Sequence, residues 1–399
     1  MKKYNFIDLF AGCGGLSEGF YRENFHALAH VEINHVACET LKTRMKYYGY
    51  KDVDKSVIET DITNDEVIDR IDLCVGKKEV DVIIGGPPCQ AYSSLGRAKD
   101  DNGMKNDPRN YLFESYVKIL NKFKPKLFVF ENVTGLLTAR INNEKIVDKI
   151  FNALGEQYKV KFDPNMNVLN AADYGVPQIR KRIIIIGVRK DIPIDVEYVY
   201  DNIIKTHSDG NEKGLKPYVT VKEAIYELPH LLPGEGVKKI DFISKRSNDF
   251  LKRIRKEGDT CLMDHISRNH NKMDIERYVE MAKNKWSFAD LLENRPDLRH
   301  EHPRVFGNSY TVQFWDKPAR TIIAHLYKDG NQFIHPDYTQ GRTITVREAA
   351  RLQSFPDDFI FEGSRTEQYK QIGNAVPPLF AEAIAKAIKK ILRELEALK

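Results

Sequence analysis

Up to about residue 190, short β-rich runs alternate with helical patterns, and this alternation constrains the fold more than any other feature of the chain. Strands separated by helices form a mostly parallel sheet with helices on both faces. The run RIIIIGV, at 182–188, is nearly all β-branched, as expected of a strand buried on both faces. The predicted strands are Tyr4–Phe10, Ala27–Glu32, Val80–Ile84, Lys126–Phe130 and Arg182–Val188, and the predicted helices cover 36–47, 112–122 and 146–158. The chain is therefore predicted to contain a doubly wound α/β domain.

The pattern changes after Lys190, where polar segments punctuated by Pro and Gly, such as HSDGNEKGLKP and LPHLLPGEG, replace the alternation. Near the end of the chain, AEAIAKAIKKILRELEAL predicts an amphipathic helix whose apolar stripe needs a partner surface. We interpret residues 1–190 as one domain that is completed by residues 366–399. Residues 191–365 are interpreted as a smaller, irregular domain.

Composition excludes several protein classes. Of the 399 residues, 42% are hydrophobic and 30% are charged, which is typical of a globular protein with a large core. No apolar run approaches the roughly 20 residues that span a bilayer, so we expect neither a signal peptide nor a membrane anchor. The five cysteines lack CxxC spacing, which argues against a disulfide framework and against a zinc site. We expect no metal and a reducing, cytoplasmic environment.

The charge distribution permits binding to a polyanion. The net charge is +5, and residues 238–256 carry eight Lys or Arg against two Asp. This segment is either a surface that contacts phosphates or a solvated helix face.

A glycine-rich turn, Asp8-Leu-Phe-Ala-Gly-Cys-Gly-Gly-Leu16, follows the first predicted strand, and Glu32 ends the second. Glycines let the backbone approach a ligand closely, and an acid after the next strand commonly accepts hydrogen bonds from ribose hydroxyls. The spacing matches neither the GxGxxG nor the GxxxxGK[ST] pattern, which argues against NAD and against binding of ATP phosphates. A nucleoside cofactor is predicted, and a turn that serves only tight packing is the alternative.

Cys89 follows another predicted strand, in Gly85-Gly-Pro-Pro-Cys-Gln-Ala-Tyr-Ser-Ser94. Open α/β sheets place their active sites beyond the carboxyl ends of strands, and two prolines fix the backbone before this thiol. A thiol with an ordinary pKa of about 8.5 needs a local positive field to become a nucleophile. A buried structural cysteine is the alternative. The Pro-Pro platform and the polar stretch 96–110, which suits a lid, favour the nucleophile.

Glu131 lies at the end of the strand predicted at 126–130, and Arg180 and Arg182 lie at the start of the last predicted strand. A carboxyl group beside a thiol and two arginines can act as a general acid, or it can be a salt-bridge anchor. Together these residues place a nucleophile, an acid and positive charge on one rim of one sheet.

At this point the sequence resembles the DNA cytosine-5 methyltransferases. The resemblance covers nearly the whole chain and rests on motifs in the family's order: DLFAGCGG, GGPPCQAYS, ENV, QIRKR, RTITVREAARLQSFPDDF and QIGNAVPP. It implies an S-adenosylmethionine-dependent methyltransferase fold with a smaller target-recognition domain.

The resemblance also implies the cofactor site. Glu32 would bind the ribose hydroxyls of S-adenosylmethionine, and Asp61 would accept from the adenine amino group. Leu16 and Ile33 stand where the family often has aromatic side chains that pack against the adenine, and Tyr92 replaces the usual Phe after PPCQ. The other residues implied for this pocket are Phe10, Gly12, Gly14, Pro87, Leu112 and Asn374.

The catalytic residues implied by the resemblance are Cys89, Glu131, Arg180 and Arg182. Cys89 would add to C6 of a cytosine rotated out of the DNA helix, Glu131 would bind its N3 and amino edge, and Arg182 would reach O2 with Arg180 beside it. The implied partner is double-stranded DNA with a specific target sequence. We expect a monomer without membrane contact, in the cytoplasm of a bacterial or phage-infected cell, paired functionally with a restriction endonuclease.

Two other interpretations compete with this one. An RNA-directed relative would keep the same active site, but more than 120 residues lie between QIRKR and the PARTI segment at 318–322, enough for a domain that reads sequence. A catalytically inactive nucleic-acid-binding module is disfavoured by the presence of Cys89, Glu131 and Arg182.

Overall fold

The computed structural model describes residues 3–88, 111–141, 143–242, 247–256, 258–299 and 310–398. The chain divides into two compact units. Unit 1 consists of Met1–Tyr174, Lys181–Lys205 and Pro378–Lys399, and unit 2 consists of Gly175–Arg180 and Thr206–Pro377. These limits differ from the boundaries drawn at 190 and 365, because residues 191–205 group with unit 1 and residues 366–377 group with unit 2.

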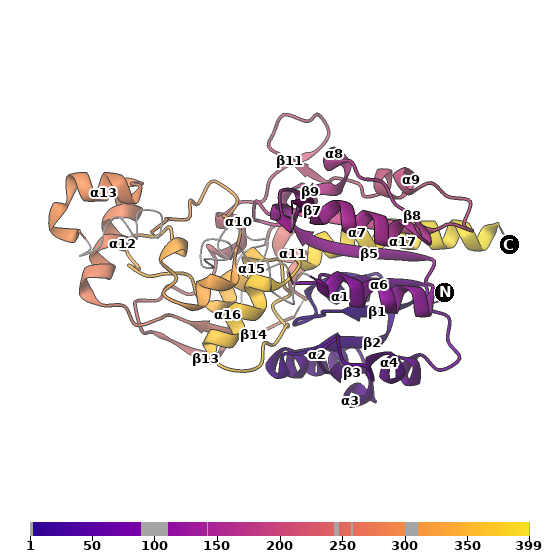
Figure 1. The fold of residues 1–399 in the computed structure, drawn as a ribbon. Helices are drawn as coiled ribbons and strands as arrows, with labels where there is room; N and C mark the ends of the chain where they lie inside the picture. The colour runs from indigo at the N-terminus through magenta and orange to yellow at the C-terminus, as the bar shows by residue number, and fades with distance from the viewer. Residues whose placement is uncertain are drawn as a thin grey trace. The chain divides into compact units, whose positions relative to one another are not determined.

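Unit 1 is built on an eight-stranded sheet with the order β3-β2-β1-β4-β5-β10-β8, and β9 also pairs with β10 (Figure 1). The strands from β3 to β5 are parallel, whereas β10 is antiparallel to its neighbours. The strands are β1 (Asn5–Leu9), β2 (His26–Glu32), β3 (Val57–Glu59), β4 (Val82–Gly85), β5 (Leu127–Val133), β8 (Tyr158–Lys159), β9 (Val168–Asn170) and β10 (Lys181–Arg189). The predicted doubly wound, mostly parallel sheet is confirmed.

The helices of unit 1 cover both faces of this sheet. Successive residues of a strand point to opposite faces, so both sets of side chains are buried. In β10, Ile183 and Ile185 join the core that includes residues of α4, α6 and α7. On β10 the backbone of Ile184 and Ile186 bonds the Tyr200 hydroxyl, which ties α9 to the sheet. The helices are α1 (Gly15–Arg22), α2 (His35–Tyr47), α3 (Val53–Ser56), α4 (Val67–Val75), α6 (Leu112–Phe123), α7 (Ile146–Gly155), α8 (Pro164–Asn167), α9 (Val196–Asp201) and α17 (Pro378–Ala397).

The C-terminal helix α17 packs directly on α1, as its apolar stripe required. A Cβ atom added at Gly19 of α1 would lie 2.3 Å from the backbone of Ala381, so only glycine permits this approach. Tyr174 stacks on Phe380, with ring centroids 5.3 Å apart. The end of the chain therefore completes the fold of unit 1. Unit 1 also contains short elements: the hairpin of β6 (Arg140–Ile141) and β7 (Glu144–Lys145), and the 3-10 turns η2 (Thr134–Leu137) and η3 (Ala171–Tyr174).

Unit 2 is less regular than unit 1, as its sequence predicts. The strands described in it form two small sheets, β11 (His207–Ser208) with β12 (Lys216–Pro217), and β13 (Gly236–Asp241) with β14 (Cys261–Ile266). A separate apolar cluster joins α12 and α13 around Met281 and Leu291. The helices are α10 (Val221–Ile225), α11 (Asp249–Ile254), α12 (Lys272–Asn284), α13 (Phe288–Asn294), α15 (Val346–Leu352) and α16 (Arg365–Asn374), with 3-10 turns η4 (Pro296–Leu298), η5 (Ala324–Tyr327) and η6 (Asn331–Phe333).

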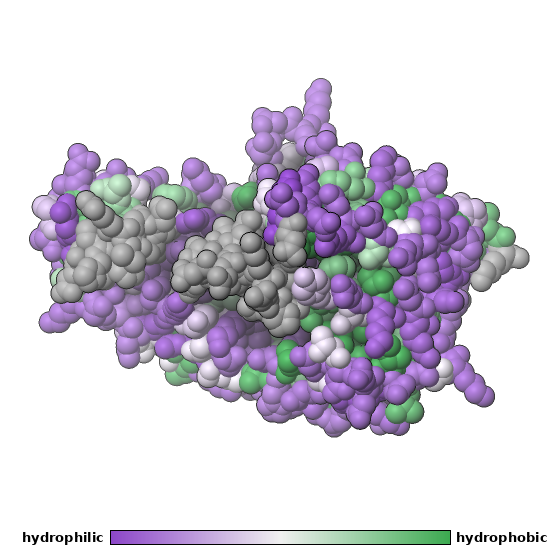
Figure 2. All heavy atoms as spheres, in the orientation of Figure 1, coloured by the Kyte–Doolittle hydropathy of each residue, from purple (hydrophilic) through white to green (hydrophobic). Residues whose placement is uncertain are grey.

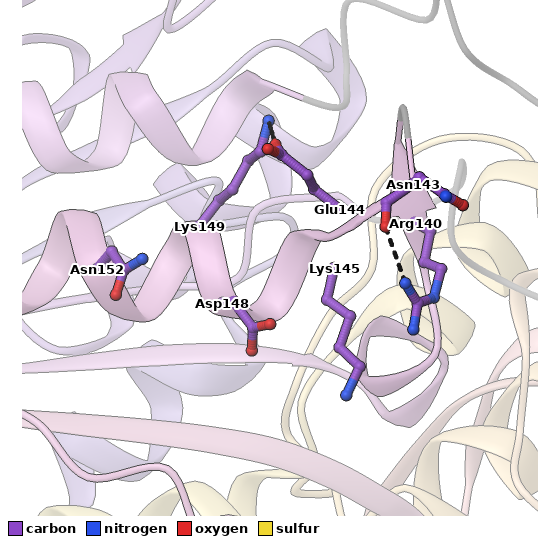
Figure 3. Close-up of a pocket in the computed structure, with 7 residues that line it drawn as sticks. All are labelled: Arg140, Asn143, Glu144, Lys145, Asp148, Lys149 and Asn152. Carbon is purple, nitrogen blue, oxygen red and sulfur yellow. Dashed lines mark hydrogen bonds and ion pairs between the residues drawn. The ribbon is translucent and has the colours of Figure 1, made fainter.

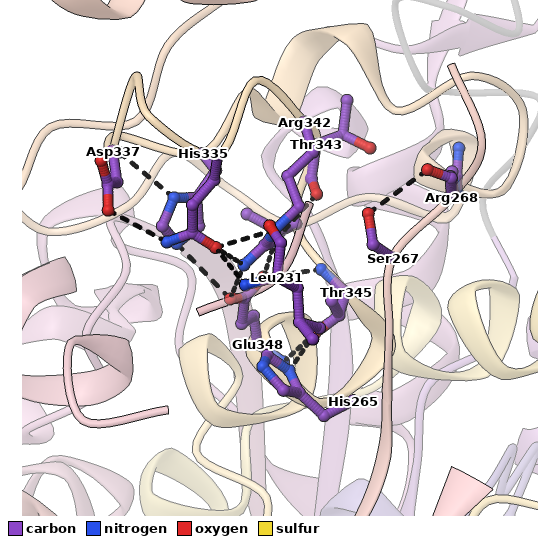
Figure 4. A network of polar contacts seen from close by, with 12 residues as sticks. Leu231, His265, Ser267, Arg268, His335, Asp337, Arg342, Thr343, Thr345 and Glu348 are labelled. Atoms are coloured by element: carbon purple, nitrogen blue, oxygen red, sulfur yellow. Dashed lines mark hydrogen bonds and ion pairs between the residues drawn. The ribbon is translucent and has the colours of Figure 1, made fainter. Parts of the chain in front are cut away.

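Buried arginines hold unit 2 together. Arg342 is 1% exposed and forms a bidentate ion pair with Glu348, both oxygens of which lie 2.8 Å from guanidinium nitrogens (Figure 4). Glu348 also closes a capping box with Thr345 at the start of α15. Arg351 pairs with Asp357 at 2.7 Å, and Arg347 donates to the carbonyl of Met263. Each buried charge is thus paired or hydrogen-bonded, as its low exposure requires.

Neutral histidines belong to the same framework. The Nε2–H of His265 donates to the Pro229 carbonyl, so its Nδ1 accepts from the Thr345 hydroxyl (Figure 4). His270 Nε2 accepts from the Thr343 amide. Burial lowers the pKa of His265 and of His270 to about 4. Both rings are therefore held in the neutral form at pH 7.

Among the described residues, no helix is both long and apolar enough to cross a membrane. Hydrophilic residues cover most of the face shown in Figure 2.

The free energy of unfolding should fall as the pH decreases from about 6.5 to about 4. The unfolded histidines bind protons near pH 6.5, whereas the folded rings of His265 and His270 resist protonation down to pH about 4, so the unfolded state takes up more protons in this range. Urea unfolding at several pH values measures the slope. His265→Gln should flatten it by up to about 1.4 kcal/mol per pH unit. An unchanged slope in this variant would contradict the assignment.

Candidate active site

Three chain segments that differ in chemistry lie at one edge of the unit 1 sheet. β1 pairs in parallel with β4, and β4 with β5, in a register that aligns Leu9 with Gly85 and Gly85 with Phe130. This register places three features at the same height along the strands: the glycine turn after β1, the Gly-Pro-Pro segment after β4 and Glu131 on β5. The strand order reverses between β1 and β4, where open α/β sheets bind their ligands.

The glycine turn holds the carboxylate of Glu32. The backbone amide of Gly12 donates to Oε2 of Glu32 at 2.8 Å, and the amide of Asn34 donates to Oε1 at 2.8 Å. Gly12 and Gly14 have φ of 55° and 87°, a region that suits glycine, and the half-buried Phe10 shares it with φ of 58°. Two amides from different loops thus orient one carboxylate at the carboxyl end of β2.

The other residues predicted for the cofactor pocket have mixed positions. Ile33 is 64% exposed beside Glu32, and Asp61 is exposed just after β3. Asp61 Oδ1 accepts from the amide and the hydroxyl of Thr63. Leu16 is buried in α1, Pro87 is buried after β4, and Leu112 is half-buried at the start of α6. Asn374 is an exposed residue at the end of α16, and it belongs to unit 2.

A buried polar chain under the glycine turn was missed by the sequence interpretation. The Ser17 hydroxyl bonds Oδ2 of Asp8 at 2.5 Å, and Nε2 of His30 lies 3.1 Å from Ser17 Oγ and 3.0 Å from the Tyr21 hydroxyl. Burial raises the pKa of Asp8 to about 8, against the lowering effect of the Ser17 bond, and lowers the pKa of His30 to about 3. This chain ties β1, α1 and β2 together. The acid directly before the glycine turn was its only sequence signal.

Glu131 and Arg182 form an ion pair at the same edge of the sheet. Arg182 Nε lies 3.0 Å from Glu131 Oε1, and the two side chains are 12% and 13% exposed. The antiparallel register aligns Arg182 with Val133, which brings its guanidinium to Glu131 on the neighbouring strand. Burial lowers the pKa of Arg182, and the Glu131 carboxylate opposes that shift, so the guanidinium stays charged. The predicted acid and positive charge are together.

The segment that leads to Cys89 contacts this strand. A Cβ added at Gly86 would lie 2.7 Å from Glu131 Oε2, and the Asn132 amide donates to the Pro87 carbonyl at 3.2 Å. Asn132 was not singled out from the sequence, although it follows Glu131 directly. The predicted nucleophile Cys89, Tyr92 and the predicted lid at 96–110 lie outside the described residues.

Arg180 has a different environment from the one predicted. It is 1% exposed, and its guanidinium donates to the carbonyls of Ile322, Gly373 and Ala375 at 2.6, 3.2 and 2.9 Å. All of these residues belong to unit 2. Arg180 lies just before the first residue of β10, so the inward and outward alternation of that strand does not set its side-chain direction. Its side chain instead hydrogen-bonds the PARTI and QIGNAVPP segments. The bonds of Arg180 are thus made to backbone carbonyls of unit 2, and its role beside Arg182 stays a prediction.

An open depression of about 490 Å³ lies on the β6–β7 hairpin and the start of α7 (Figure 3). Glu144 pairs there with Lys149 at 2.6 Å, and Arg140 donates to the Asn143 carbonyl at 2.8 Å. The Glu144, Lys149 and Arg140 side chains that line this depression thus bond to neighbouring residues of the hairpin and of α7. Among the described residues, no group of three or more His, Cys, Asp or Glu side chains is placed to hold a metal ion.

Comparison with known proteins agrees with this geometry. The family model for C-5 cytosine-specific DNA methylase matches residues 4–390. The chain is 34% identical to the type II methyltransferase M.Bpa9945I of Bacillus paralicheniformis, over 97% of this chain and 98% of that protein. It is 36% identical to the type II methyltransferase M.DdeI of Desulfomicrobium norvegicum, over 96% of this chain and 88% of that protein.

The fold is similar to that of solved methyltransferases. A prophage-encoded protein of E. coli, described as a DNA modification methyltransferase, superposes with a TM-score of 0.71 at 27% identity, covering 98% of this chain and 100% of that one. The resemblance drawn from the sequence motifs is therefore confirmed, together with the methyltransferase fold. The chain belongs to the C-5 cytosine-specific DNA methylase family.

Proposed function

We propose that the protein methylates C5 of a cytosine in a specific double-stranded DNA sequence, with S-adenosylmethionine as the methyl donor and a covalent bond between Cys89 and C6. The observation that carries the proposal is the Glu131–Arg182 pair, which lies beside the Gly-Gly-Pro-Pro segment that precedes Cys89 in the sequence. A carboxyl group and a guanidinium at one sheet edge, beside a segment that is followed in the sequence by a thiol, suit the attack on a pyrimidine ring.

The chemistry needs all three groups. C5 of cytosine is too weak a nucleophile to take a methyl group, so the Cys89 thiolate adds to C6 and moves electrons toward C5. In the complex with cytosine Glu131 must be in its protonated form, which donates its proton to N3, and Arg182 stabilises the negative charge that develops at O2. After methyl transfer solvent takes the C5 proton, and the electron pair of that C–H bond re-forms the C5–C6 double bond as Cys89 leaves as a thiolate. N3 returns its proton to Glu131, and the ring regains its aromatic character. The base must be outside the DNA helix for these contacts, so we propose that it is flipped.

The residues around Glu32 fit a nucleoside. Gly12 leaves open space beside the backbone, since an added Cβ would meet nothing within 4 Å. Ile33 offers an exposed apolar surface for a base, and the oriented Glu32 carboxylate has further lone pairs for ribose hydroxyls. Asp61 is proposed to accept from the adenine amino group, with Phe10, Gly14, Leu16, Pro87 and Leu112 along the pocket. S-adenosylmethionine, when bound, supplies an electrophilic methyl group.

We propose that residues 191–365 read the DNA sequence. Lys238 and Lys239 on β13 and Lys252 on α11 are exposed and suit phosphate contacts. The basic run as a whole is not free for this role. Arg255 pairs with Glu227 at 3.0 Å and Lys256 pairs with Asp358 at 3.4 Å, so part of it stabilises unit 2 itself.

The biological role proposed is modification in a restriction-modification system, because the most similar relatives compared are type II methyltransferases. A monomer in the bacterial cytoplasm, paired functionally with a restriction endonuclease, completes this proposal.

Transfer of labelled methyl groups to unmethylated DNA tests the activity. Nucleoside mass spectrometry should find 5-methylcytosine as the product. Glu131→Gln should slow the transfer by at least about 100-fold, because an amide has no acidic proton for N3. Glu144→Gln, which changes a carboxylate of the surface hairpin, should keep the wild-type rate. A methylated adenine, or equal rates for both variants, would refute the proposal.

Glu32→Gln should weaken binding of S-adenosylmethionine. The neutral amide cannot accept from both backbone donors and a ribose hydroxyl, and losing an acceptor that leaves a donor unpaired costs about 1–3 kcal/mol, or roughly 5- to 150-fold in Kd. Isothermal titration calorimetry measures this change. Glu39→Gln on α2 is the control and should bind normally. If both variants have the wild-type Kd, Glu32 is not in the cofactor site.

A further inference from the structure

We propose that Asn132 is a positioning residue, which aligns the segment that carries Cys89 with Glu131. This inference rests on the function proposed above. The Asn132 side chain does not need to touch the cofactor or the cytosine to have this effect. Asn132 is only 2% exposed, and it makes two hydrogen bonds.

Both ends of the Asn132 amide are used. Its Oδ1 accepts from the backbone amide of Val133 at 2.7 Å, and its Nδ2 donates to the Pro87 carbonyl at 3.2 Å. The partners determine the orientation of the amide, because the first is a donor and the second is an acceptor. Leucine has the size but makes neither bond. Aspartate makes both bonds only when it is protonated.

The Gly-Pro-Pro segment has few other ways to be anchored. Pro87 and Pro88 have no N–H group, so their carbonyls must provide their backbone contacts. The bond from Asn132 fixes the direction of the Pro87 carbonyl, and the ring of Pro88 fixes the next φ. Only ψ of Pro88 then remains variable before the backbone nitrogen of Cys89. A single side-chain bond therefore removes most of the freedom of this link.

Two consecutive residues of β5 contact two consecutive residues of this segment. Glu131 Oε2 lies only 2.7 Å from the position that a Cβ atom on Gly86 would take, so this carboxylate packs against Gly86. The next residue, Asn132, donates a hydrogen bond to the carbonyl of Pro87. The acid and the link to the thiol are thus set by the same stretch of one strand. A displacement of about 1 Å between reacting groups can cost on the order of 100-fold in rate.

The single-turnover rate of methyl transfer tests this role, with saturating DNA and S-adenosylmethionine. Asn132→Leu should lower the rate constant by about 100-fold at every pH, while Kd for S-adenosylmethionine changes less than about fivefold. Asn132→Asp should approach the wild-type rate at low pH and fall away from it as the pH rises. The introduced carboxyl loses the proton that bonds Pro87, and Glu131 and Arg182 are the charged neighbours that set where this happens.

Asn167 provides a matched control in unit 1. It is 0% exposed, and its amide donates to the Tyr200 hydroxyl at 2.8 Å and accepts from the Asp163 amide at 2.8 Å. Asn167→Leu and Asn167→Asp should lower thermal stability without changing the rate of the folded enzyme or its pH profile.

The outcomes separate the inference from the proposed function. If the wild-type protein methylates no DNA, the function fails. If the wild type is active and the Asn132 variants keep its rate, or if Asn132→Asp shows no recovery at low pH, the positioning role is overturned. Should Asn132→Leu fail to fold, the pH profile of Asn132→Asp relative to wild type still decides the question.

Discussion

The parallel pairing of β1, β4 and β5 is the constraint on which the proposed site depends. Because these strands run in one direction and in close register, the glycine turn, the Gly-Pro-Pro segment and Glu131 emerge at the same edge of the sheet. The antiparallel strand β10 then brings Arg182 to Glu131 from the other direction. Strand pairing thus brings residues from distant parts of the chain to one place, and their side chains can contact each other across adjacent strands.

The two units are stabilised in different ways. Unit 1 buries apolar strands under helices, and α17 completes it by close contact at Gly19. Unit 2 relies on buried arginines whose charges are matched, as in the Arg342–Glu348 and Arg351–Asp357 pairs. Loss of one partner from such a pair leaves an uncompensated buried charge and typically costs about 3–5 kcal/mol. The RTITVREAARLQSFPDDF motif is therefore explained by stability within unit 2.

Much of the sheet was predictable from the sequence, because long apolar runs such as RIIIIGV have only one favourable environment. The short strands β3, β8 and β9 were missed, since two or three residues carry no periodic signal. Glu131 and Arg182 were predicted to lie together, and they do. Arg180 could not be told from Arg182 by spacing, because its partners are backbone carbonyls far along the chain. Asn132 was missed for the same reason, as its partner is a carbonyl of Pro87.

The central claim is that Cys89 forms a covalent bond with the target cytosine beside Glu131 and Arg182. DNA with 5-fluorocytosine at the target position tests it most directly, because fluorine cannot leave C5 as a cation and the protein should remain bound. With S-adenosylmethionine present, the adduct should survive denaturing electrophoresis, and mass spectrometry should map it to the peptide that contains Cys89. Cys89→Ala should abolish it, whereas Cys261→Ala should retain it. An adduct that persists in Cys89→Ala, or that maps to another residue, would contradict the account.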